Sequence, residues 1–141
     1  MSSFYAISDN VYGPYKLIGN HGASPDHGSY FKWRNQWFNA FTILDPTLYH
    51  RATGLCYVHF RDNGEMVTDQ LIVEYGVGQY NAEWNRIEAE WYMAVEGNEK
   101  RENPRRGFDV CKITDGSYLY FPNIYNIKEN TGICFFAACG N

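Results

Sequence analysis

The sequence predicts an all-β protein, and three observations lead to this prediction. Aromatic residues make up 18% of the chain, and they fall in short apolar runs that alternate with polar residues, as half-buried strands do. Glycine, asparagine and aspartate stand between these runs, where tight turns favour them. No long run repeats its apolar residues with the 3.6-residue period of a helix. The 141 residues suffice for one ordinary domain or two very small ones.

The N-terminal part has the pattern of a meander of short strands joined by tight turns. A hairpin turn is expected at residues 34–36, and a second turn at Asp62, Asn63 and Gly64. A polar loop at 20–28 precedes the hairpin, and residues 71–84 are irregular because Gly76 and Gly78 interrupt them. The expected strands are residues 4–8, 15–19, 29–33, 37–43, 56–60 and 65–68.

The C-terminal part begins with a candidate strand at residues 86–92, in which apolar and polar residues alternate. On such a strand Glu88 and Glu90 point their carboxylates to the same side. Residues 96–106 are charged and polar, which predicts a solvated loop. Further strands are expected at residues 108–113, 117–121 and 133–139, with a turn at 114–116.

Composition restricts the classes of partner. The formal net charge is −4 and the isoelectric point about 5.5, which argues against nucleic acid. No apolar run approaches the ~20 residues of a membrane-spanning helix, and the first residues lack the basic and apolar regions of a signal peptide. Four cysteines without Cys-x-x-Cys spacing are compatible with free thiols or with a disulfide, so the compartment stays open: Cys56, Cys111, Cys134 and Cys139.

Four residues are candidates for chemistry. His27 ends the polar loop, where it could bind a metal, contact a ligand or cap the loop. Arg51 follows Tyr49 and His50 and offers a fixed cation to hydroxyl-rich or anionic ligands, although pairing with a surface carboxylate is the alternative. Glu88 and Glu90 provide oxygen ligands suited to calcium. Their alternatives are a solvated face or a pair of catalytic carboxylates about 6–7 Å apart.

Two parts of the chain resemble carbohydrate-active families. Residues 5–9, 13–15, 27–29, 32–43, 49–51 and 62–64 resemble the last blade of glycoside hydrolase family 43. Residues 87–90, 114–119 and 121 resemble the first half of a family 6 carbohydrate-binding module. The resemblance implies residues 1–75 as the last blade of a five-bladed β-propeller, 76–85 as a linker, and 86–141 as a partial β-sandwich of jelly-roll type.

The resemblance also implies a function for the parent enzyme. Members of the hydrolase family cleave glycosidic bonds in xylose- and arabinose-containing polysaccharides by an inverting mechanism with two carboxylates. Those carboxylates lie in earlier blades, so this chain is expected to be inactive alone. By the same resemblance His27 and Arg51 lie near the substrate, and Glu88 and Glu90 hold structural calcium. Lys112 replaces an aromatic residue of the module's sugar cleft and Ser117 replaces an aspartate, which puts the usual cleft in doubt.

The resemblance makes plant cell-wall polysaccharide or oligosaccharide the expected ligand. The expected partners are the missing propeller blades of a parent chain. The resemblance implies that this parent enzyme is secreted or held at the cell surface. A lone blade and a half module leave strand edges and apolar faces open, so a fragment is expected to be poorly stable. The first alternative is a free-standing, non-catalytic carbohydrate-binding protein. The second is a structural β protein without a ligand.

Overall fold

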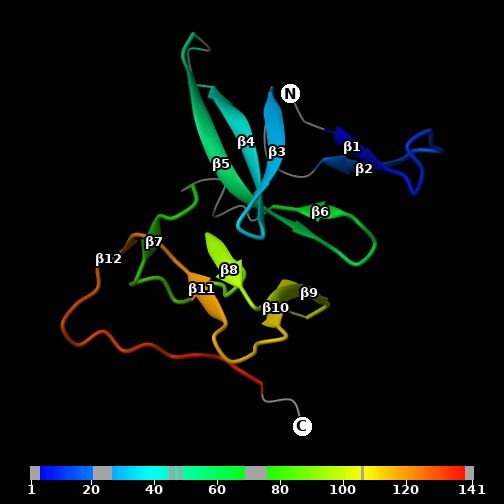
Figure 1. The fold of residues 1–141 in the computed structure, drawn as a ribbon. Helices are drawn as coiled ribbons and strands as arrows, with labels where there is room; N and C mark the ends of the chain where they lie inside the picture. Colours follow the sequence, from blue (N-terminus) through cyan, green and yellow to red (C-terminus); the bar gives the residue numbers. More distant parts are fainter. Residues whose placement is uncertain are drawn as a thin grey trace.

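The computed structural model describes residues 4–20, 27–44, 47, 49–68, 76–105 and 107–138. Every regular element in these ranges is a β-strand, so the predicted all-β class is confirmed (Figure 1). The described ranges contain no helix long and apolar enough to cross a membrane. Parts of the predicted loop at 20–28 and of the irregular stretch at 71–84 lie outside the described residues, as does Cys139.

A four-stranded antiparallel sheet forms the largest element. It has the order β3 (Gly28–Trp33), β4 (Gln36–Leu44), β5 (Arg51–Phe60) and β6 (Met66–Val67). The predicted hairpin between β3 and β4 is confirmed, and its two turn residues, Arg34 and Asn35, have φ of 44° and 65°. Two consecutive left-handed residues give the turn a twist that matches the flanking strands. The predicted turn between β5 and β6 is closed by Gly64 N–H, which donates to the Arg61 carbonyl.

A separate hairpin lies beside this sheet, as expected for the N-terminal strands. It pairs β1 (Phe4–Ile7) with β2 (Lys16–Asn20) and projects to one side (Figure 1). Tyr5 connects it to the sheet, because the Tyr5 hydroxyl accepts a 3.0 Å hydrogen bond from the Met66 backbone N–H.

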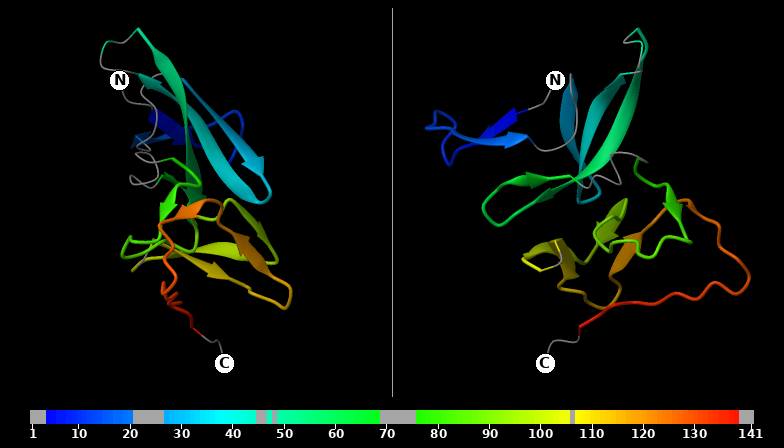
Figure 2. Two further views of the ribbon diagram at one scale, coloured as in Figure 1. Left: turned by 90° about the vertical axis from the view of Figure 1, so that its left-hand side faces the viewer. Right: turned by 180° about the vertical axis from the view of Figure 1, so that it is seen from behind.

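The C-terminal part consists of three small pairs of strands. Two are antiparallel, β8 (Ala94–Glu96) with β11 (Tyr118–Tyr120) and β9 (Glu99–Asn103) with β10 (Gly107–Cys111). The third is parallel, β7 (Tyr80–Asn81) with β12 (Ile124–Tyr125). Both turned views show these pairs against one end of the four-stranded sheet (Figure 2).

The predicted strand at residues 86–92 is wrong. The segment is irregular, and Trp91 N–H donates to the Glu88 carbonyl to close a turn. Glu90, Trp91 and Tyr92 are all buried, at 6%, 4% and 2% exposure. Three consecutive buried side chains are incompatible with the alternation of a one-sided strand, because neighbouring strand positions point to opposite faces. The expected same-side placement of Glu88 and Glu90 therefore loses its geometric basis.

Two further expectations for the C-terminal part are wrong. The charged stretch at 96–106 contains β9, because its charges find partners: Glu102 with Arg61, and Glu99 with Lys112. The expected strand at 133–139 is absent from 133–138, where Ile133, Phe135 and Phe136 are exposed and pair with no described strand. In Figure 2 the chain after β12 runs as an extended segment.

The hydrophobic core crosses from the sheet into the C-terminal part. Phe38 packs between Phe31 and Tyr57, with ring centroids 5.3 and 5.6 Å away. The Tyr57 hydroxyl donates to that of Tyr80, which donates to the Trp91 carbonyl. Burial raises the pKa of both phenols, that of Tyr80 to about 12. Val77, Tyr80 and Trp84, from the expected linker, all join this core, while the division into two units stays a prediction.

The close packing of Gly54 in β5 gives a first test. A Cβ added at Gly54 would lie 2.6 Å from one atom of the Phe41 ring and 2.9 Å from the Ile43 side chain. Gly54→Ala should therefore lower the free energy of unfolding by about 1–3 kcal/mol, the usual cost of overpacking. Gly132→Ala is the matched control, because no atom lies within 4 Å of its added Cβ. Urea denaturation of both variants measures the difference, and equal stability would contradict the packing described.

Candidate functional site

The structure brings His27 and Arg51 together. Arg51 is the first residue of β5. His27 directly precedes β3 and extends the pairing of β3 with β4, because the Thr42 N–H donates to the His27 carbonyl at 3.0 Å. Arg51 Nη1 lies 3.5 Å from His27 Nδ1, at the long limit for a hydrogen bond. Because a guanidinium only donates, a hydrogen bond in this contact has the His27 ring nitrogen as its acceptor. Two residues 24 positions apart thus meet at one end of the sheet.

The surroundings of this pair suit a polar ligand. Both side chains are exposed, and Tyr49, two residues before Arg51, is 89% exposed. A guanidinium and an imidazole N–H can donate to ligand oxygens, and an exposed phenol ring offers a flat apolar face. The pair is therefore a candidate ligand-binding surface.

Glu88 and Glu90 lie in different environments. The carboxylate of Glu88 forms an ion pair with Arg86 and has 22% side-chain exposure. Glu90 is buried, and its negative charge acts on Lys100 and Tyr92. Within the described ranges no three His, Cys, Asp or Glu side chains are grouped as ligands of a metal ion. Calcium at Glu88 and Glu90 stays a prediction, and binding would require Glu88 to exchange Arg86 for the ion.

Lys112 and Ser117, which differ from the pattern of the carbohydrate-binding module that the sequence resembles, both have structural contacts. Lys112 has a φ of 54°, and its exposed amine lies 2.9 Å from the Glu99 carboxylate, whose hydrogen bond and charge raise the pKa of the amine. Ser117 Oγ accepts from Thr114 N–H and donates to the Gly97 carbonyl at 2.8 Å. Ser117 therefore stabilises the predicted turn at 114–116, which is confirmed.

A buried polar cluster around Gln36 was not anticipated from the sequence. Gln36 is fully buried, and its Nε2 donates to the carbonyls of Glu90 and Tyr92 at 3.2 and 3.0 Å. Its Oε1 accepts from Lys100 Nζ at 2.5 Å. The side chain thus connects the β3–β4 hairpin to both the 90–92 segment and β9. Lys100 stands among charged neighbours, and no spacing in the sequence distinguishes it from a surface lysine.

Lys100 and His59 share the centre of this cluster. Lys100 Nζ lies 2.9 Å from His59 Nδ1 and 4.9 Å from the centroid of the Tyr92 ring. The imidazole of His59 packs against the Phe108 ring, with centroids 4.9 Å apart. Burial lowers the pKa of Lys100 to about 7, although the charge of Glu90 acts in the opposite direction. Burial first, and then the charge of Lys100, lower the pKa of His59.

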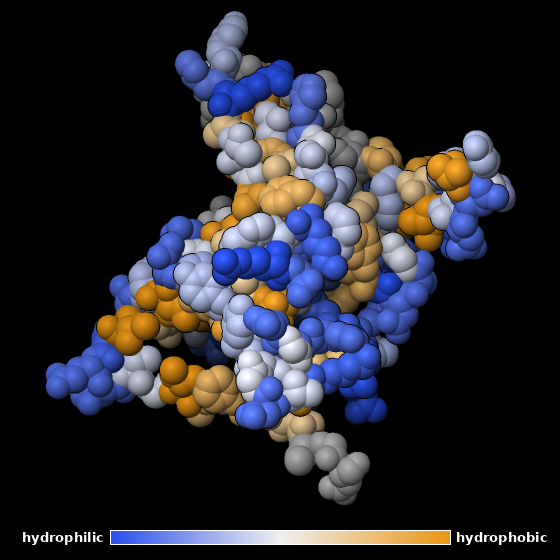
Figure 3. Space-filling model, viewed as in Figure 1, coloured by the Kyte–Doolittle hydropathy of each residue, from blue (hydrophilic) through white to orange (hydrophobic). Residues whose placement is uncertain are grey.

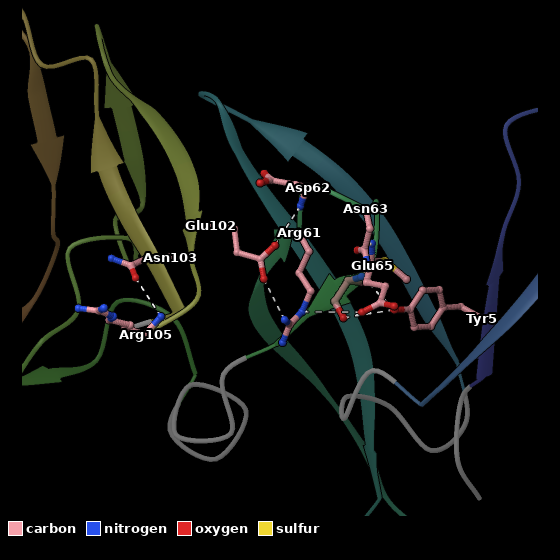
Figure 4. A network of polar contacts seen from close by, with 9 residues as sticks. Tyr5, Arg61, Asp62, Asn63, Glu65, Glu102, Asn103 and Arg105 are labelled. Atoms are coloured by element: carbon pink, nitrogen blue, oxygen red, sulfur yellow. Dashed lines mark hydrogen bonds and ion pairs between the residues drawn. The ribbon is translucent and has the colours of Figure 1, made fainter.

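A second polar contact joins the sheet to the C-terminal part near this cluster. Glu102 of β9 accepts from Arg61 Nη1 at 2.9 Å and from the Asp62 backbone N–H at 3.2 Å. Figure 4 shows Arg61 between Glu102 and Glu65 at the end of β5. These contacts hold β9 next to the β5–β6 turn. His59 and Phe60 are the last two residues of β5, directly before this turn.

The described cysteines Cys56, Cys111 and Cys134 are free thiols. Cys56 is fully buried in β5, and burial raises the pKa of its thiol to about 12. A thiol with so high a pKa is a poor nucleophile near neutral pH, and Cys56 packs in the hydrophobic core.

The comparisons with known proteins give no relative. No protein-family model, curated protein or solved structure significantly matches this chain.

The shifted pKa of Lys100 predicts how stability depends on pH. Lys100 titrates near pH 10.5 when unfolded and near 7 when folded, so between these values the unfolded chain binds a proton that the folded chain lacks. This group therefore makes stability rise with pH, by up to about 1.4 kcal/mol per pH unit. Urea denaturation between pH 7 and pH 8.5 should show this slope.

The variant Lys100→Met should remove the contribution of Lys100 to that slope. Lys128→Met is the control, because Lys128 is an exposed lysine that pairs with Glu83 on the surface. An unchanged slope in Lys100→Met would contradict the burial of the amine.

Proposed function

We propose that this chain is part of a glycoside hydrolase that acts on xylose- and arabinose-containing plant polysaccharides. In this proposal the chain contributes a polysaccharide-binding surface, and the catalytic carboxylates belong to other blades of the parent enzyme. The contact between His27 and Arg51 supports the proposal, because it brings two polar side chains that can bind hydroxyl groups to the same end of one sheet.

The shape of the sheet supports the assignment to a propeller blade. Propeller blades are sheets of four antiparallel strands, and β3 to β6 form such a sheet with consecutive strands as neighbours. His27 and Arg51 lie at one end of this sheet. His27 directly precedes β3, and Arg51 is the first residue of β5, two positions after Tyr49. A ligand held there would contact the ends of strands rather than a face of the sheet.

The exposed strand β3 supports the proposal that other segments of a parent enzyme pack around the sheet. All residues of β3 are exposed, including Tyr30, Phe31 and Trp33 at 41%, 41% and 44%. Within the described residues β3 is an edge strand, whose free backbone groups favour pairing or cover by another segment. Figure 3 shows further hydrophobic side chains on the surface of the β1–β2 hairpin and of the C-terminal segment. Neighbouring blades of a parent enzyme would cover such surfaces.

Binding to polysaccharide tests the proposal. Electrophoresis through a gel that contains arabinoxylan should retard the chain. Arg51→Ala should lower the affinity by about tenfold or more, because a hydrogen bond from a charged group contributes roughly 1.5–3 kcal/mol. Arg101→Ala is the matched control, since Arg101 is an exposed arginine on β9. His27→Ala should weaken binding in the same direction as Arg51→Ala.

Equal retardation of the Arg51→Ala and Arg101→Ala variants would reject the binding surface. Hydrolysis of an aryl xyloside or arabinofuranoside by the chain alone would reject the view that its catalytic carboxylates lie elsewhere.

Structural calcium at Glu88 and Glu90 belongs to the same proposal. An ion that binds only the folded chain stabilises it by about 2.7 kcal/mol at a concentration 100 times its Kd. Calcium should therefore raise the melting temperature of the wild type and leave that of Glu88→Ala unchanged. Glu129→Ala, which changes an exposed glutamate, should respond like the wild type. Melting curves that are identical with calcium and with chelator would remove the site.

A further inference from the structure

A cleft of about 440 Å³ opens between the β3–β4 hairpin, the end of β5 and the start of β9. Ligand pockets in proteins range from about 300 to 1,000 Å³, so a small molecule fits this volume. Two aromatic rings line the cleft, Trp37 and Phe60, which are 36% and 42% exposed and meet edge to face at 5.8 Å. The cleft therefore has a partly exposed apolar wall.

The amine of Lys100 lies at the wall of this cleft. Lys100 lines the cleft and is only partly buried. Its Nζ donates to Gln36 Oε1 at 2.5 Å, and it lies 2.9 Å from His59 Nδ1 and 4.9 Å from the centroid of the Tyr92 ring. Gln36, His59 and Tyr92 line the same cleft. Because the residues that contact the amine all border the cleft, a molecule bound there meets the amine.

The contacts of this amine favour its neutral form. Its hydrogen-bonding partners are an amide and an imidazole, and within the described part of the chain Lys100 forms no ion pair. Burial lowers the pKa of Lys100 to about 7, against the opposing charge of Glu90. A neutral amine has the free electron pair that an ammonium lacks, and removal from water is one way in which proteins activate lysine as a nucleophile.

From the cleft and the contacts of the amine we propose that Lys100 is a nucleophile that forms an imine with a small aldehyde bound in the cleft. Nζ forms a bond to the carbonyl carbon, and the electron pair of the C=O bond moves to the oxygen, which takes one proton from the nitrogen. That hydroxyl then leaves with the second amine proton as water, and a C=N bond remains, so the step needs no oxidant or reductant. His59 Nδ1 lies 2.9 Å from the reacting nitrogen, within reach of both protons.

The lining of the cleft selects aldehydes with an aromatic or short apolar substituent. An aromatic ring in the ligand packs against Trp37 and Phe60 by stacking or by edge-to-face contact. Neither His27 nor Arg51 lines the cleft. The imine site therefore does not depend on the function proposed for those two residues, and either proposal can fail alone.

Reductive trapping with benzaldehyde tests the site in the unaltered chain. Sodium cyanoborohydride reduces an imine to a stable secondary amine, and mass spectrometry of the digested chain then locates it. At pH 7 about half of an amine with a pKa of about 7 is neutral, against less than ~0.1% of an ordinary lysine. Although partial burial slows its access to reagents, Lys100 should be labelled at least about tenfold faster than Lys128, an exposed lysine on the surface. Labelling of Lys100 at the rate of Lys128 or more slowly would overturn the proposal.

A matched pair of tryptophan variants tests whether the cleft binds the aldehyde. Trp37→Ala removes part of the apolar wall and should slow the labelling of Lys100 by benzaldehyde about threefold or more. Trp33→Ala should leave this rate unchanged, because Trp33 is similarly exposed, at 44%, and does not line the cleft.

Formaldehyde separates the loss of aldehyde binding from a change in the amine itself. Because it has no apolar substituent, formaldehyde should label Lys100 equally fast in the wild type and in both tryptophan variants. A benzaldehyde rate unchanged by Trp37→Ala, equal slowing by the two variants, or equal slowing of both aldehydes by Trp37→Ala would overturn the cleft as the aldehyde site.

Discussion

The buried amide of Gln36 connects the four-stranded sheet directly to the C-terminal part of the chain. It donates to the carbonyls of Glu90 and Tyr92 and accepts from Lys100, so it satisfies three partners on two segments of the C-terminal part. Loss of this amide would leave two buried carbonyls and the partly buried amine of Lys100 without this partner, at about 1–3 kcal/mol for each neutral group. The position of β9 and the burial of Lys100 both depend on this amide, because Lys100 of β9 donates to it.

The sheet was predictable because its signals are local. Alternating apolar residues and the turn residues Arg34, Asn35 and Gly64 specify β3 to β6 without reference to the rest of the chain. The His27–Arg51 pair was named from sequence, although its contact requires β4 between the two residues. The C-terminal part was less predictable, because its residues are buried by tertiary contacts. Trp91 and Tyr92 are buried side by side, and Lys100 is held by Gln36, which lies 64 positions away.

The same contacts explain how the amine of Lys100 and the imidazole of His59 are accommodated at the junction between the sheet and the C-terminal part. Burial of Lys100 would be costly if its amine had no partners, and Gln36, His59, Glu90 and the Tyr92 ring all contribute to its environment. Nδ1 of His59 contacts this amine, and Nε2 has no hydrogen-bond partner among the residues that the structure describes. The polar cluster that joins the two parts therefore gathers the amide of Gln36, the amine of Lys100 and the imidazole of His59 at the junction.

The four-stranded sheet and the C-terminal part share one hydrophobic core, so we expect them to unfold together. Native-state hydrogen exchange measures this most directly, by comparing amides of β4–β5 with those of β8–β11. The structure predicts equal free energies of opening for both, lowered together by Gln36→Leu and unaffected by Gln79→Leu, which changes an exposed glutamine. Amides of β8–β11 that exchange at a much lower free energy, with no response to Gln36→Leu, would contradict the claim and favour two independent units.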